Sequence, residues 1–177
     1  SPAALAFALP LLRRIVDESG RIQTKGVLAN ALRKDGRIDE AEAMMRDLID
    51  RAAEQGEYRL ASAIAGDLLT LLRSSGRLTE ALDAAEAMAG YTRRAGLGPW
   101  TQLSDEGMRL QVLAAMGRYD EVLAAVEARR AEMAALPEEG EAEEAVQPWN
   151  VREGLLDTGR SAAMHSERWE QALALNA

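Results

Sequence analysis

A turn motif recurs along the chain at a nearly constant spacing, and this recurrence constrains the fold more than any other feature. The segments GRIDEAE, GRLTEAL and GRYDEVL begin at Gly36, Gly76 and Gly117, and ERWEQAL at Glu167 keeps the pattern without its glycine. The first three motifs begin 40 and 41 residues apart, and the fourth follows after 50. A fixed period of this length predicts an array of similar supersecondary units.

The longer last interval contains the stretch PEEGEAEEAVQP, from Pro137 to Pro148. It carries many carboxylates together with two prolines and a glycine, which is typical of a solvated loop. The carboxylates lack the alternating spacing of a calcium-binding loop. We therefore expect an acidic surface loop at 137–147.

Apolar residues between the turns follow a helical period. In the segment after the first turn they recur every three or four residues, at Ile38, Ala41, Met44 or Met45, Leu48, Ile49 and Ala52. Aromatic residues make up only 4% of the chain, so the core must consist mainly of leucine, alanine and other aliphatic side chains, which favours helices over sheets. Each unit is therefore predicted to be a pair of helices that covers its apolar face by stacking on the next pair.

The turn GR-apolar-x-E-A, with the small residues Ala41 and Ala81 after it, resembles the tetratricopeptide repeat. This resemblance implies an all-α, right-handed superhelical solenoid of antiparallel helix pairs, with about four repeats. It also implies that the first helix of each pair lines a concave groove. Two departures stand out: the unit has about 40 residues where the family usually has 34, and Leu69 and Leu110 replace the family's small residue in the first helix.

The repeats and the two ends of the chain set the predicted domain organisation. We expect one domain over 1–177, with a cap or partial repeat at 1–20 and repeats at 21–56, 57–96, 97–136 and 148–177. The chain begins with Ser1 and stops within an apolar pattern, which suggests a fragment of a longer protein. Trp169, Leu173 and Leu175 leave the last unit without a polar cap. This uncapped C-terminal end predicts further repeats or self-association with another copy.

Polar residues recur at one position of the predicted first helices, namely Asn30, Thr70, Gln111 and Ser161. Arg33 and Arg73 begin a second row one helical turn further on. The resemblance implies that both rows face the groove. Hydrogen-bonding side chains there could bind the backbone of an extended peptide, and the two arginines favour an acidic segment.

Two further features recur with the period. Glycines at Gly26, Gly66 and Gly107 stand about ten residues before the turns, and each costs about 1 kcal/mol relative to alanine in a helix. The close approach of a neighbouring helix, or of a ligand in the groove, would offset that cost.

Aromatic residues mark the predicted start of three units, where they would anchor the helix against the preceding unit: Tyr58, Trp100 and Trp149.

Composition excludes several classes of function. The net charge of −8 disfavours nucleic acid and anionic membrane surfaces, and no apolar run approaches the roughly 18 residues of a membrane span. The chain has no cysteine, which fits a cytoplasmic protein, and its basic residues are nearly all arginine, which suggests a bacterial source. His165 is the only histidine, so no metal or other cofactor site and no catalytic constellation is predicted.

These observations predict a non-catalytic scaffold that binds a protein or peptide. The alternative is a ligand- or peptide-sensing regulatory domain of a larger signalling protein. An enzyme built on a helical-repeat scaffold would need a convergent polar cluster, and the sequence pattern contains none.

Overall fold

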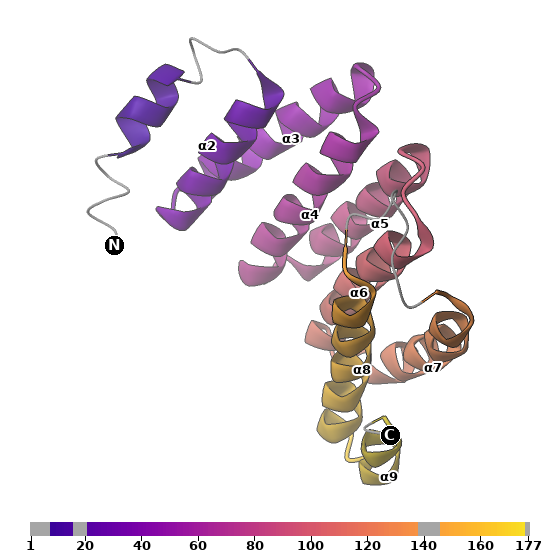
Figure 1. The fold of residues 1–177 in the computed structure, drawn as a ribbon. Helices are drawn as coiled ribbons and strands as arrows, with labels where there is room; N and C mark the ends of the chain where they lie inside the picture. The colour runs from indigo at the N-terminus through magenta and orange to yellow at the C-terminus, as the bar shows by residue number, and fades with distance from the viewer. Residues whose placement is uncertain (1–7, 16–20, 138–145, 176–177) are drawn as a thin grey trace. The chain divides into compact units, whose positions relative to one another are not determined.

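The computed structural model describes residues 8–15, 21–137 and 146–175, and Figure 1 shows their arrangement. A helix at 8–15 is followed by the eight helices α2 (Ile22–Lys34), α3 (Ile38–Glu54), α4 (Tyr58–Ser74), α5 (Leu78–Arg94), α6 (Pro99–Ala115), α7 (Tyr119–Ala135), α8 (Pro148–His165) and α9 (Trp169–Ala174). The described residues contain no strand, which confirms the all-α prediction. Most of the predicted cap at 1–20 and of the predicted loop at 137–147 lies outside the described residues.

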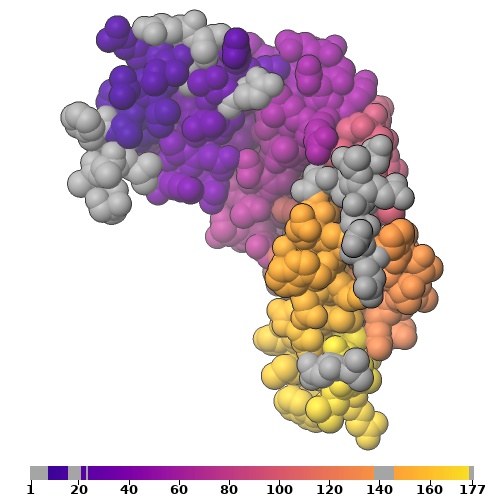
Figure 2. All heavy atoms as spheres, in the orientation of Figure 1, coloured from indigo at the N-terminus to yellow at the C-terminus, as the bar shows by residue number. Residues whose placement is uncertain are grey.

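Contacts divide the chain into two compact units, Ser1–Tyr91 and Thr92–Ala177, with the boundary inside α5. In the first unit α3 packs on both α2 and α4, and in the second unit α8 packs on α6, α7 and α9. From α2 to α7, and again from α8 to α9, successive helices are joined by tight turns and run in opposite directions, and side chains fill the spaces between the ribbons within each unit (Figures 1 and 2). Each unit is thus a stack of antiparallel helices around a core of leucine, alanine and methionine.

One turn geometry ends six of the eight labelled helices. A residue with positive φ follows the helix, and the next backbone N–H donates to a carbonyl five residues earlier, as in Arg37 to Leu32 at 3.0 Å and Arg77 to Leu72 at 3.0 Å. Glycine adopts positive φ without steric cost, and the glycines at these turns have φ between 67° and 82°: Gly36, Gly56, Gly76, Gly96 and Gly117. The chain therefore reverses about every 20 residues, because Gly56 and Gly96 form the same turn between pairs.

Glu167 occupies the glycine position of the last turn. Its φ is 59°, and the following Arg168 N–H donates to the Ala163 carbonyl at 2.8 Å, as at the glycine turns. The alignment of the fourth repeat on Glu167 is therefore confirmed. A side chain in this left-handed conformation costs about 1 kcal/mol relative to glycine.

Two of the recurring helix glycines, Gly26 and Gly107, do not serve the close packing that their recurrence predicted. A Cβ added at Gly26 would meet nothing within 4 Å, and one at Gly107 would lie 3.6 Å from Leu155, an ordinary contact. The close approach occurs instead at Gly159, where a Cβ would lie 2.9 Å from a Val126 methyl and 3.0 Å from a Leu175 methyl. For Gly26 and Gly107 the packing explanation is therefore wrong.

Candidate functional site

In the first unit, Asn30 links two first helices. Its Nδ2 donates to Oδ2 of Asp67 on α4 at 2.7 Å, and its Oδ1 accepts a hydrogen bond from Nε of Arg33 at 3.3 Å. The predicted neighbours Asn30 and Arg33 therefore lie together on α2, but Asn30 also contacts Asp67, which the sequence pattern did not indicate. These bonds use one of the two N–H groups and one of the two oxygen lone pairs of the Asn30 amide.

Thr70 and Arg73 occupy the corresponding positions on α4. The Thr70 hydroxyl donates to the Gly66 carbonyl at 3.0 Å, one turn back in the same helix, which leaves its oxygen able to accept. Arg73 is half-buried and interacts within the chain. These two side chains thus have local partners, and whether they contact a ligand stays a prediction.

In the second unit, a groove of about 160 Å³ lies between the first helices α6 and α8. Gln111 lines it, as the predicted row requires, together with Leu103, Ser104, Gly107, Met108, Asn150, Val151, Gly154 and Leu155. The wall formed by α8 was not predicted. Ser161 is exposed further along α8 and is not one of the lining residues.

The groove between α6 and α8 offers both polar and apolar contacts. Gln111 and Asn150 carry side-chain amides, each with donor and acceptor groups, and Met108 adds a flexible apolar side chain. Gly154 is exposed and projects no side chain, so the surface stays open at this point.

His165 has a structural environment at the end of α8. Its Nδ1 lies 2.7 Å from the Ser161 carbonyl oxygen, and its ring stacks on Tyr119 with centroids 5.8 Å apart. In the part of the chain that the structure describes, no cluster of histidine, aspartate and glutamate side chains is arranged to hold a metal ion. Nor does this part contain a helix long and apolar enough to cross a membrane.

The aromatic residues at the starts of units behave differently from one another. Tyr58 stacks on Tyr91 with centroids 6.4 Å apart, and Nε1 of the buried Trp100 donates to the Pro137 carbonyl at 2.9 Å. Both contacts are with the far end of the same helix pair. Trp149 is 66% exposed, so the prediction that it anchors its helix is wrong.

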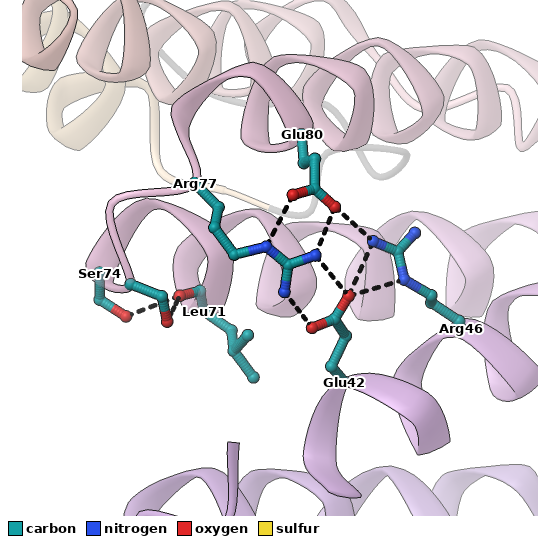
Figure 3. A network of polar contacts seen from close by, with 7 residues as sticks. Glu42, Arg46, Leu71, Ser74, Arg77 and Glu80 are labelled. Carbon is teal, nitrogen blue, oxygen red and sulfur yellow. Dashed lines mark hydrogen bonds and ion pairs between the residues drawn. The ribbon is translucent and has the colours of Figure 1, made fainter. Parts of the chain in front are cut away.

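An ion-pair network joins α3 to the start of α5 (Figure 3). Nε of Arg77 donates to Oε1 of Glu80 at 2.7 Å, and another guanidinium nitrogen donates to Glu42 at 3.1 Å. Arg46 donates to Glu42 at 3.0 Å and to Glu80 at 3.4 Å. The hydrogen bonds from Arg77, with Arg46 second, lower the pKa of Glu42, and Arg77 likewise lowers the pKa of Glu80.

This pairing recurs after other turns. Arg37 donates to Glu40 at 2.7 Å, and Arg118 donates to Glu121 at 2.6 Å. The arginine precedes the helix and the glutamate lies in its first turn, where a negative charge is favourable. The Arg-x-x-Glu spacing in the sequence could have predicted these pairs.

Comparison with known proteins gives similarity of fold alone. No protein-family model and no curated protein sequence matches the chain. A crystal structure of nearly identical TPR-like repeats of a putative kinesin light chain from Podosopora anserina aligns with a TM-score of 0.68 and 18% identity, covering 98% of this chain and 87% of that one. A second crystal structure of those repeats, from a variant, aligns with a TM-score of 0.69 and 17% identity, covering 97% and 85%. The chain therefore has the fold of a tetratricopeptide-like helical repeat protein.

Proposed function

We propose that this chain is a non-catalytic interaction module that binds a peptide segment of another protein along its first helices. The observation that carries the proposal is the groove between α6 and α8, where the amides of Gln111 and Asn150 flank apolar side chains. An extended peptide needs hydrogen-bond partners for its backbone and shallow apolar surface for its side chains, and this groove offers both. The repeat fold supports the proposal, because stacked repeats present extended binding surfaces.

The residues of the first unit, taken by themselves, suggest the charge of a peptide that this unit would bind. The row of Asn30 and Thr70, flanked by Arg33 and Arg73, would favour an acidic segment. Asn30 would bond the peptide through its second amide N–H or second oxygen lone pair, and Thr70 would accept a peptide N–H. This part of the proposal rests on the shared position of the residues in their helices.

The test is selection of peptides from a displayed random library on the wild-type chain, followed by affinity measurements on two variants. Gly154→Leu fills the groove at a position where a Cβ has open space, and we expect it to weaken the selected peptides by at least about tenfold. Ala128→Leu adds the same side chain at an exposed position of α7 and is the matched control. Equal binding by both variants, or no enriched peptide at all, would contradict the proposal.

A further inference from the structure

A second groove lies in the first unit, between the second helices α3 and α5, on different elements from those of the proposed peptide site. Its volume is about 340 Å³. The floor consists of buried apolar side chains from three helices, namely Ile49, Ala65, Leu68 and Ala84. The rims carry the charged residues Arg46, Asp50, Glu80 and Asp83, and Tyr91 lies at the far end against Tyr58.

Small side chains on α5 keep this groove open. Ala84 and Ala87 are three residues apart and therefore lie on one side of the helix. Counted from the preceding turn glycine, α3 has Met44 where α5 has Ala84. A side chain as large as methionine at residue 84 would occupy the space that the alanine leaves.

Some of the charged side chains along the groove form ion pairs and others do not. Arg46 pairs with Glu42 and Glu80, so the network in Figure 3 neutralises charge at one end. Asp50 and Asp83 are exposed, and within the described residues neither makes an ion pair or a side-chain hydrogen bond. An apolar floor is thus bordered by two unpaired carboxylates, one from each helix.

We propose that the groove between α3 and α5 binds a basic amphipathic helix of a partner protein. An apolar side chain of that helix would rest on Ile49, Leu68 and Ala84, and flanking lysines or arginines would pair with Asp50 and Asp83. Two helices that lie side by side leave a groove along their length into which the side-chain ridge of a third helix packs. From Glu80 to Tyr91 the α5 wall is about 16 Å long, or three helical turns of a partner. The unpaired carboxylates select a basic helix over an acidic one.

The probe is an amidated, fluorescently labelled peptide of about 14 leucine and lysine residues with one apolar and one basic face. Its binding to the full chain is followed by fluorescence anisotropy at about 0.1 M salt, where general charge attraction is screened beyond about 10 Å. We expect saturable binding, with amide chemical shifts in the wild-type chain changing around Ile49 and Ala84. The same peptide with glutamate in place of lysine should not bind.

Two pairs of variants separate the groove from the overall negative charge. Asp50→Asn with Asp83→Asn should weaken binding about tenfold, and Glu54→Gln with Glu86→Gln, which removes two exposed charges from the same helices, should weaken it less than about twofold. Ala87→Leu fills the groove from its exposed rim and should abolish binding, whereas Ala43→Leu at an exposed position of α3 should not. Circular dichroism verifies that each variant keeps the wild-type helicity.

Three results would overturn the proposal: equal weakening by the two charge pairs, undiminished binding to Ala87→Leu, or equally tight binding of the glutamate peptide. Each would mean that the groove does not select a basic helix. The Gly154→Leu variant distinguishes this inference from the proposed function. It should bind the basic peptide as the wild type does, because Gly154 lies in the other unit and lines the other groove.

Discussion

Asp105 places a carboxyl group at a helix position that is apolar in two of the other three repeats. Twelve residues before the turn position, the second and fourth repeats have Ile64 and Leu155, and both are buried. Asp105 is only 7% exposed, and its Oδ2 has no hydrogen-bond partner in the described part of the chain. Burial raises the pKa of this carboxyl, against the smaller opposing effects of the Thr92 hydrogen bond and the Arg93 charge.

We predict that Asp105→Asn raises the free energy of unfolding at pH 7.5 by about 1 kcal/mol. A buried polar group without a partner costs about 1–3 kcal/mol, and an ionised group costs more than a neutral one. Asparagine has nearly the same shape and keeps an oxygen that can accept from Thr92, so the change removes mainly the buried charge. In a chain of 177 residues, 1 kcal/mol corresponds to an increase of about 2–4 °C in Tm.

The pH dependence gives this prediction its sharpest test. Because the folded-state pKa of Asp105 is raised, its contribution to stability is complete below the ordinary pKa of about 3.9 and is lost as the pH rises through the folded-state value. The advantage of asparagine should therefore be largest at pH 7.5 and shrink as the pH falls towards 4.5. Urea unfolding of both proteins over this range, followed by circular dichroism, measures the difference.

The exposed Asp83 provides the control, since Asp83→Asn should change the free energy of unfolding by less than about 0.5 kcal/mol at any of these pH values. A less stable Asp105→Asn protein at pH 7.5 would show that the carboxylate has a favourable environment. An advantage independent of pH would show that loss of the charge is not its cause. Either result refutes the reasoning.

Three further predictions concern the packing, the turns and the ion-pair network. Gly159→Ala should destabilise the fold by about 1–3 kcal/mol through overpacking, whereas Gly154→Ala in the same helix should stabilise it by about 0.5–1 kcal/mol; thermal unfolding of the pair decides. Glu167→Gly should raise the free energy of unfolding by about 1 kcal/mol in urea titrations, and no gain would mean that the turn is unstrained. Glu42→Gln should lower it by about 1 kcal/mol at pH 7. Because the pKa of Glu42 is lowered, this loss of stability should vanish as the pH falls through the folded-state pKa of Glu42. A loss of stability that persists in acid would show that packing, and not the charge, is its cause.

The turns show how far sequence reasoning extends in this fold. The Gly-Arg motif predicted the turns at Gly36, Gly76 and Gly117, and it also located the turn at Glu167 where the glycine is missing. The equivalent turns at Gly56 and Gly96 were missed, because their following residues are not arginine. The turn depends on positive φ and on a backbone N–H donor, and any residue except proline supplies that donor. The arginine belongs instead to the ion pair with the next helix.

The recurring glycines and aromatic residues show that the repeat period does not predict the packing between helices. Gly26 and Gly107 recur in step but contact no crowded backbone, whereas Gly159, which is out of step, lies against Val126. Trp100 is buried and Trp149 is exposed, although each follows a proline at a helix start. Spacing predicts where a residue lies along its helix. It does not predict how closely the neighbouring helix approaches, because that distance depends on the side chains of both helices.

The row of polar residues reveals the same limit at the candidate site. Asn30, Thr70 and Gln111 occupy one position of successive first helices, as the spacing predicted. Asn30 is held by Asp67, a residue of the next first helix, and Thr70 bonds its own helix through Gly66. Gln111 lines a groove whose other wall comes from α8. The same helix position thus has a different role in each of the three repeats, because each first helix contacts different side chains of the next first helix. In this fold the repeat period predicts where the helices and turns of the backbone lie. The residues that differ between repeats determine which part of the surface can bind a ligand.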